Sequence, residues 1–141
     1  MLPSPIIEGT LPAFYVNETG IAVITVPFSM SRAVNRNEVS GFSLKIKSLQ
    51  GSEYLGTFKT KTGMDYTEMV VKFELTRSST DKYGNDILQG LGDSITLTKG
   101  AFYKAQIAYI NNQDEVGYYS TVGIIKYTTK PNVSIANLST S

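Results

Sequence analysis

Short runs in which apolar and polar residues alternate dominate this chain, and they restrict its fold more than any other feature. In the clearest run, GFSLKIKSL (41–49), large apolar residues alternate with serine and two lysines. Successive side chains of a β-strand point to opposite faces, so this period of two predicts a strand with one buried and one wet face. Comparable runs are IAVITVPFSM (21–30), EYLGTFKTKT (53–62), MVVKFELT (69–76), SITLT (94–98), AFYKAQIAYI (101–110) and YYSTVGIIKYT (118–128). About seven strands without a long helical pattern predict an all-β fold, an antiparallel β-sandwich of immunoglobulin-like type.

The segments between and beyond these runs suggest how the domain is bounded. The polar stretch 77–94 is rich in turn-forming residues, and Ile87, Leu88 and Leu91 within it predict a short helical turn. Residues 1–12 contain three prolines, which favour an extended arm or a leading edge strand. We therefore expect the sandwich to span 13–130, followed at 131–141 by a second arm or the start of a further domain.

The composition excludes several kinds of chemistry. The chain has no Cys and no His, so it cannot hold a thiol nucleophile, an imidazole base or a typical zinc site. We expect no cofactor and no metal. The formal net charge of +1 argues against a nucleic-acid-binding protein, which normally carries a basic excess. The apolar runs are shorter than the roughly 18 residues that a membrane span needs, and we also expect no secretory signal.

Carboxylates are the remaining catalytic candidates, and they do not form a recognisable pair. Acidic residues are scattered over predicted loops and strand exteriors, for example Glu53, Asp65, Glu68, Asp93 and Asp114. A glycosidase needs two carboxyl groups about 5–10 Å apart across a cleft. The stretches DKYGND and NNQDE contain oxygen ligands, but neither has the spacing of a calcium loop, and both are better explained as turns. We therefore expect a protein that is not an enzyme.

The segment 97–120 (LTKGAFYKAQIAYINNQDEVGYYS) resembles the end of a fibronectin type III domain. The family has a leucine, a glycine three residues later and a tyrosine six residues later, and these are matched by Leu97, Gly100 and Tyr103. The resemblance implies that Tyr103 lies in the core near a strand corner and that its hydroxyl bonds to the backbone. The family also has a core tryptophan, which this chain lacks, so Val26 or Phe28 is expected to fill that volume.

Tyrosines of the last predicted hairpin suggest an interaction surface. Adjacent residues of a strand point to opposite faces, so one of Tyr118 and Tyr119 should be exposed. An exposed stripe of Tyr109, Tyr118 or Tyr119, and Tyr127 would suit a protein interface, with a polar rim formed by Arg32 and Arg36. Core packing of most tyrosines is the alternative, because the chain has no tryptophan.

The general style of the chain is similar to that of accessory domains in bacteriophage virion proteins, such as tail, neck, baseplate and capsid-decoration proteins. This resemblance implies a non-enzymatic structural or assembly module that contacts copies of itself or other virion subunits. We would expect it in the cytoplasm of the producing cell and then in the virion. Two alternatives remain: a module that binds a surface glycan through tyrosines, and an accessory domain of an enzyme encoded beyond Ser141.

Overall fold

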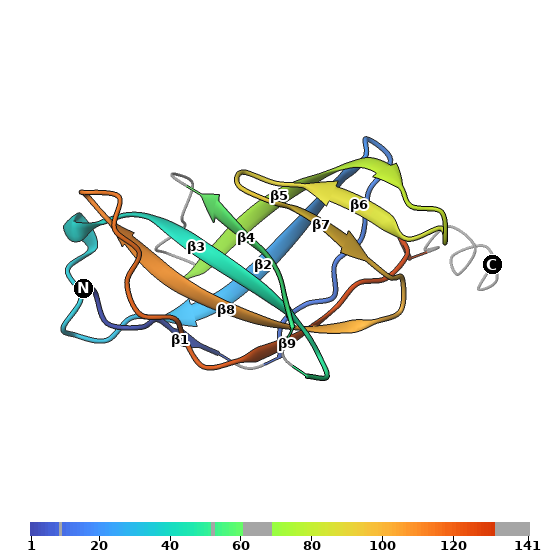
Figure 1. The fold of residues 1–141 in the computed structure, drawn as a ribbon. Coiled ribbons are helices and arrows are strands. Elements are labelled where there is room, and N and C mark those ends of the chain that lie inside the picture. Colours follow the sequence, from blue (N-terminus) through green and yellow to red (C-terminus); the bar gives the residue numbers. More distant parts are fainter. Residues whose placement is uncertain (9, 52, 61–68, 132–141) are drawn as a thin grey trace, which may run out of the picture.

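The chain forms two antiparallel β-sheets in a computed structural model that describes residues 1–8, 10–51, 53–60 and 69–131. One sheet has the order β1-β2-β5-β6-β7 and the other the order β4-β3-β8-β9, as Figure 1 shows. The strands are β1 (Ile6–Ile7), β2 (Ile21–Ser29), β3 (Val39–Ser48), β4 (Tyr54–Thr60), β5 (Val70–Thr80), β6 (Asp86–Gln89), β7 (Ser94–Leu97), β8 (Phe102–Asn111) and β9 (Gly123–Lys126). A 3-10 turn, η1 (Arg36–Glu38), precedes β3. The predicted all-β class is confirmed.

The alternating residues divide as the sequence predicts, because one parity of each long strand faces a shared core. In β5, Val71, Phe73 and Leu75 are buried, while Lys72 and Glu74 between them are exposed. Side chains from both sheets meet in this core. The ring of Phe28 on β2 lies 5.0 Å from that of Phe42 on β3 and 6.4 Å from that of Tyr109 on β8.

These three aromatic rings pack together toward the end of the sandwich where β2 and β8 finish and β3 begins, in a chain without tryptophan. Phe28 is only 2% exposed, so it fills core volume as the sequence predicts. Tilted aromatic contacts of this kind add modest stabilisation beyond the area that they bury.

Two contacts join the sheets at their edges. On one side, the N–H of Lys59 on β4 donates to Leu91 O at 2.8 Å, and the N–H of Asp93 donates to Thr57 O at 3.2 Å. These bonds attach the turn between β6 and β7 to the edge of β4. On the other side, β1 pairs with β2, and Phe14 then forms a parallel bridge with Tyr127 beyond β9. The N-terminal segment therefore passes from the edge of one sheet to the edge of the other.

The strand count differs from the prediction, since the described residues form nine strands and the sequence predicted about seven. One additional strand, β1, has only two residues. The other, β6, lies where the sequence predicted a helical turn, and that prediction is wrong. Leu88 is directly opposite Ile95 of β7 in the register and is fully buried. Pairing with β5 and β7 determines the conformation here, because four residues carry too little local signal.

The predicted role of Tyr103 is confirmed. Tyr103 is 7% exposed at the start of β8, and its hydroxyl accepts a hydrogen bond of 2.7 Å from the N–H of Thr98. The bond ties the turn that leads into β8, where Gly100 has a φ of +87°. A tyrosine that bonds backward across a strand corner is a feature of immunoglobulin-like sandwiches.

The chain ends differ in what the structure describes. Residues 1–12, predicted as an extended arm or leading strand, contain β1, and Leu2 and Leu11 in this segment are buried in the common core. Of the predicted C-terminal segment 131–141, all but Pro131 lies outside the described residues.

Candidate interaction face

The predicted exposed tyrosine stripe is wrong at two of its positions. Tyr109 and Tyr127 both have an exposed fraction of 0%. Tyr109 shares its parity in β8 with Tyr103 and Ile107, and this parity faces the core. Tyr127 packs against Phe14, with 5.1 Å between the ring centroids. The alternation in residues 101–110 places Tyr109 on the same face as Tyr103, which was expected in the core. The sequence therefore already indicated that Tyr109 is buried.

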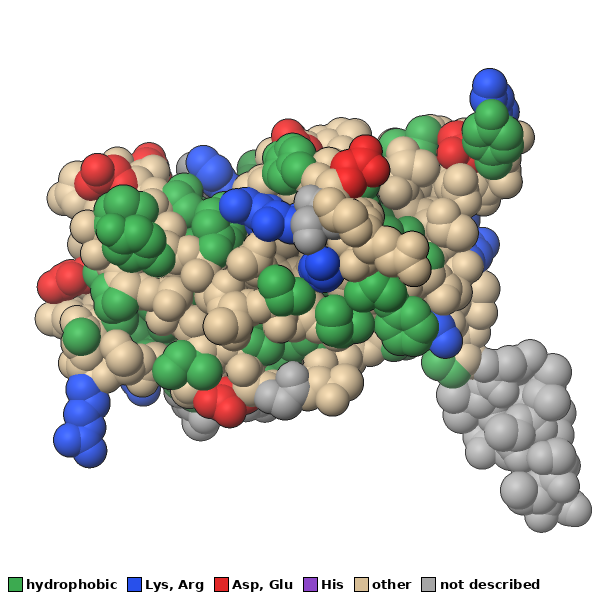
Figure 2. All heavy atoms as spheres, turned by 60° about the horizontal axis from the view of Figure 1, so that its bottom comes forward, with side chains coloured by type: hydrophobic (Ala, Val, Ile, Leu, Met, Phe, Trp, Pro, Cys, Tyr) green, Lys and Arg blue, Asp and Glu red, His purple; other side chains and the backbone are tan. Residues whose placement is uncertain are grey.

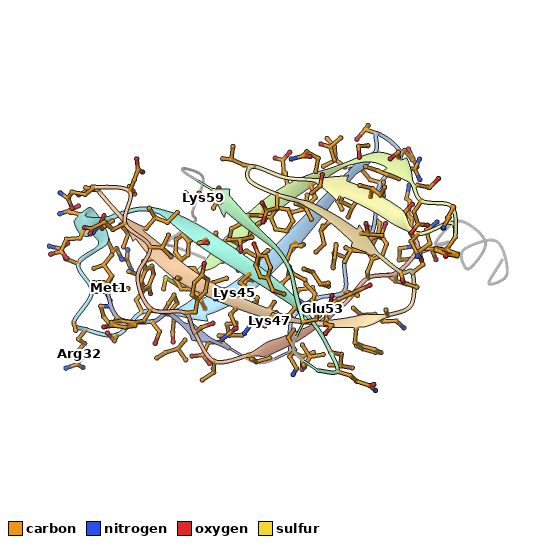
Figure 3. All side chains as sticks on the ribbon, viewed as in Figure 1. Met1, Arg32, Lys45, Lys47, Glu53 and Lys59 are labelled. Atoms are coloured by element: carbon orange, nitrogen blue, oxygen red, sulfur yellow. The ribbon has the colours of Figure 1, made fainter. Side chains whose placement is uncertain are left out.

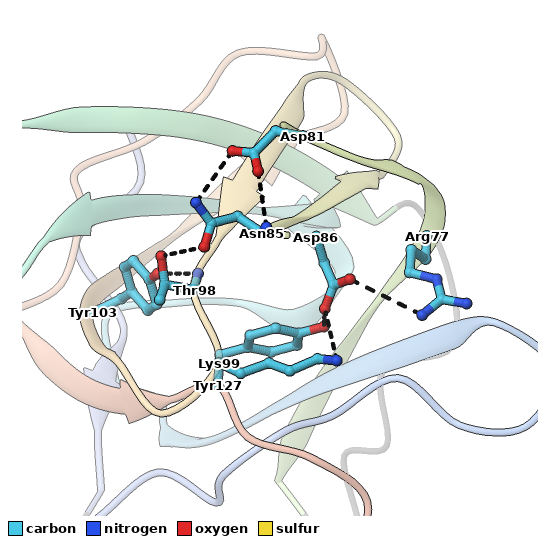
Figure 4. Close-up of polar contacts among 8 residues, drawn as sticks. All are labelled: Arg77, Asp81, Asn85, Asp86, Thr98, Lys99, Tyr103 and Tyr127. Carbon is cyan, nitrogen blue, oxygen red and sulfur yellow. Dashed lines mark hydrogen bonds and ion pairs between the residues drawn. The ribbon is translucent and has the colours of Figure 1, made fainter. Parts of the chain in front are cut away.

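Tyr127 reaches Asp86, the only buried charged residue in the described part of the chain, as Figure 4 shows. Its hydroxyl donates a hydrogen bond of 2.7 Å to the carboxylate of Asp86, which is 1% exposed. Two half-exposed cations approach the same carboxylate: Arg77 at 4.0 Å and Lys99 at 3.9 Å. Burial and the bond to Asp86 raise the pKa of Tyr127 above its usual range.

This cluster links the two sheets. Asp86 begins β6 and Tyr127 follows β9, so the bond connects the two sheets. The other nearby carboxylate, Asp81, accepts bonds from the backbone N–H groups of Tyr83 and Asn85 and from the Asn85 side chain. Asp81 therefore shapes the β5–β6 turn, as turn residues commonly do.

The remaining predicted interface residues are accessible but do not form one group. Tyr118 is 60% exposed, and Tyr119 is half-buried. Neither lies in a strand, so the expected alternation does not apply to them. Arg32 and Arg36 are both exposed in the segment before β3, and Figure 3 shows Arg32 at the end of the molecule near Met1, apart from Lys45 and Lys47.

Tyr119 leads to a surface that the sequence did not predict. Its hydroxyl lies 2.8 Å from Ser43 Oγ, and the ammonium of Lys45 lies 4.0 Å from its ring centroid. The backbone after Tyr119 is held on β8, since the N–H of Ser120 donates to Ile107 O at 2.7 Å and Gln106 Nε2 donates to Ser120 O at 2.8 Å. The backbone of this segment therefore lies along the edge of β8, and the Tyr119 side chain reaches over the outer side of the sheet β4-β3-β8-β9.

The rest of this outer side carries lysines, and we call it the lysine face. The four strands contain five lysines and no aspartate or glutamate: Lys45, Lys47, Lys59, Lys104 and Lys126. All five have the outward parity, opposite to that of the buried residues in their strands. Lys47 and Lys104 lie directly opposite each other in the register of β3 and β8. Like charges in such positions destabilise a sheet.

Apolar side chains adjoin the lysines at the β9 edge. Phe102 and Ile124 have outward parity on β8 and β9 and are 45% and 43% exposed. Lys126 lies with its ammonium 5.5 Å from the Phe102 ring centroid. Figure 2, which looks onto the side at the bottom of Figure 1, shows hydrophobic side chains at several places with both basic and acidic side chains among them.

Other kinds of site have less support among the described residues. Hollows beside Phe14, Asn112 and Ser40 have volumes of about 170, 300 and 150 Å³. These volumes lie at or below the lower end of the range for ligand pockets. Within the described ranges, no three Asp or Glu residues come close enough together to bind a metal ion. Asp65 and Glu68, two of the candidate carboxylates, lie outside the described residues.

No protein-family model matches the chain, and no curated protein is similar to it. In the part of the chain that the structure describes, no helix has the length and apolar character needed to cross a membrane.

Proposed function

We propose that this chain is a non-enzymatic assembly module of a multi-subunit particle, of the kind found in bacteriophage virions. The observation that carries the proposal is the exposed apolar pair Phe102 and Ile124, which the paired strands β8 and β9 hold among the lysines of the lysine face. Apolar side chains surrounded by polar ones on a flat surface are typical of protein–protein contact sites. The module presents this surface without needing a pocket or a cofactor.

The strand order supports an immunoglobulin-like variant of this module. The order β1-β2-β5 corresponds to strands A, B and E, and the order β4-β3-β8-β9 corresponds to C′, C, F and G. The tyrosine corner at Tyr103 occurs at the equivalent place, at the start of strand F. One departure is the β6–β7 hairpin, which follows the E strand and occupies the position where strand D would pair with E.

Glycan binding has weaker support. Among the described residues, the tyrosines with the largest exposed fractions are Tyr54, Tyr83 and Tyr118, and they lie on β4, in the β5–β6 turn and after β8. A glycan array separates the two functions, because an assembly module gives no saccharide signal.

Light scattering on the purified chain, from micromolar to millimolar concentration, tests the proposal. We expect the average mass to rise with concentration, and we expect the double variant F102S/I124S to remain monomeric. The matched control is Val23→Ser, since Val23 is 37% exposed on the outer side of the other sheet. A chain that stays monomeric throughout, and that does not cross-link to purified particles of its source, contradicts the proposal.

A further inference from the structure

The lysine face indicates which kind of partner the apolar pair would meet, and this inference rests on the proposed function. We propose that the outer side of the sheet β4-β3-β8-β9 docks an acidic protein surface. The apolar contact at Phe102 and Ile124 would be buried, and the lysines would pair with carboxylates around it.

The distribution of charge is the first argument. The whole chain is nearly neutral, with 13 basic and 12 acidic residues. The four strands of this sheet nevertheless contain five lysines and no acidic residue. The opposite sheet is mixed, since β5 alone carries Lys72, Glu74 and Arg77. The strands of this sheet therefore carry an excess of positive charge in a balanced protein, with the carboxylate of Asp93 bonded at the β4 edge. Such a surface attracts and orients a partner of opposite charge.

The register of the strands is the second argument. Lys47 and Lys104 stand directly opposite each other, although like charges at such positions cost stability. Lys45 follows on the same side of β3, two residues from Lys47, and its neighbour across the β8 pairing is the uncharged Gln106. An acidic partner would place carboxylates over these neighbouring ammonium groups.

The chemistry of the face favours a protein over a nucleic acid or a glycan. Bases and sugars stack on open aromatic rings, but Tyr119 and Phe102 on this face already contact lysines, and Tyr54, opposite Lys47, is bonded through its hydroxyl to Asp93. Lys45 lies over Tyr119 and Lys126 lies over Phe102. The four strands carry no arginine, the residue best suited to bidentate phosphate contacts. The exposed Ile124 is covered well only by another apolar side chain.

Titration with poly-L-glutamate tests the inference, with binding measured from backbone amide shifts in NMR spectra at low ionic strength. We expect the shifts to concentrate on β3, β8 and β9, and the affinity to fall steeply as salt is added. The variant K45E/K47E should bind at least tenfold more weakly. The variant K72E/K82E should bind as the wild type does, because Lys72 faces outward from the other sheet and Lys82 lies in the β5–β6 turn.

The two variants are matched in charge, because each changes the formal net charge from +1 to −3. A similar loss of affinity in both variants overturns the inference, since only total charge would then matter. Tighter binding to an oligothymidylate of equal length overturns the assignment to a protein partner. If K45E/K47E unfolds, K45Q/K47Q is compared with K72Q/K82Q, since each of these changes the formal net charge from +1 to −1.

The proposed function and this inference can fail separately. Self-association that depends on Phe102 and Ile124 but not on salt or on Lys45 and Lys47 supports the assembly module and overturns the acidic partner. Polyglutamate binding by a chain that never associates through its apolar pair supports the lysine face and contradicts the assembly module.

Discussion

The hydroxyl of Tyr127 donates a hydrogen bond of 2.7 Å to the buried carboxylate of Asp86, across 41 residues of sequence. Tyr127 also packs against Phe14. One side chain thus joins the β6–β7 hairpin, the end of β9 and the N-terminal segment. Arg77 and Lys99 approach Asp86 at longer distances, so the tyrosine provides the closest contact to this charge.

Replacing Tyr127 with phenylalanine should therefore destabilise the fold. The variant keeps the ring but leaves Asp86 without its short hydrogen bond, which costs about 1–3 kcal/mol in a buried site. Equilibrium urea denaturation measures the change. Tyr118→Phe is the control, because that side chain is 60% exposed and its change should stay within about 0.5 kcal/mol. Equal stability of the two variants would show that the bond to Asp86 contributes nothing.

Replacing Gly117 with alanine should loosen the N-terminal segment. A Cβ atom at this position would lie 2.6 Å from Leu2 O, so the backbone of Leu2 must move. Overpacking of this kind costs about 1–3 kcal/mol. It should also break the bond of 3.1 Å from the N–H of Tyr118 to Leu2 O, which speeds amide exchange at Tyr118.

Gly56→Ala is the control for this substitution. At Gly56 the nearest atoms would be 3.5 Å away, an ordinary contact, so we expect a change below about 1 kcal/mol. If Gly117→Ala left both stability and exchange at Tyr118 unchanged, the close contact with Leu2 would not matter for folding.

The carboxylate of Asp93 should make stability depend on acid pH. It accepts bonds from the hydroxyl of Tyr54 at 2.7 Å and from the N–H of Thr57 at 2.9 Å, and chiefly the first of these lowers the pKa of Asp93. A folded-state pKa below the unfolded value means that the stabilisation is complete above the unfolded pKa of about 4. It is then lost as the pH falls through the folded-state pKa.

Urea midpoints measured at neutral pH and in acid test this dependence. Asp93→Asn should lose stability at neutral pH and show a smaller further decrease in acid than the wild type. Tyr54→Phe should weaken the same dependence. An identical pH profile for the wild type and Asp93→Asn would contradict the role of this carboxylate.

The sequence predicted what depends on local alternation and on a few spaced residues. The strand through Leu44 and the strand through Phe73 follow directly from the period of two, and the leucine, glycine and tyrosine at 97, 100 and 103 located the strand corner. The prediction of a helical turn at β6 was wrong because a segment of four residues adopts the conformation that the adjacent strands impose. Its pairing with β5 and β7 joins residues whose proximity no local pattern reveals.

The candidate site was harder to predict than the fold, because it depends on strand register. Lys47 and Lys104 each follow from alternation as outward residues of separate strands. That they face each other is a property of the β3–β8 pairing, 57 positions apart in the numbering of the chain. The prediction of an exposed stripe was wrong at Tyr109 for a different reason. It rested on the number of tyrosines in the composition, whereas the parity of Tyr109 in β8 places its side chain in the core.

Lys47→Glu should raise stability while it weakens binding to an acidic partner. The substitution places a carboxylate opposite Lys104, converting a repulsive cross-strand pair into an attractive one, with a gain of about 0.2–1 kcal/mol. Urea denaturation should show this gain at low salt, and added salt should reduce it because the pair is near the surface. Lys72→Glu is the control: Lys72 is opposite the uncharged Thr25, so we expect no gain. If Lys47→Glu were less stable than the wild type, the two lysines would not repel each other in the folded chain, and the register would lose its value as evidence for an acidic partner.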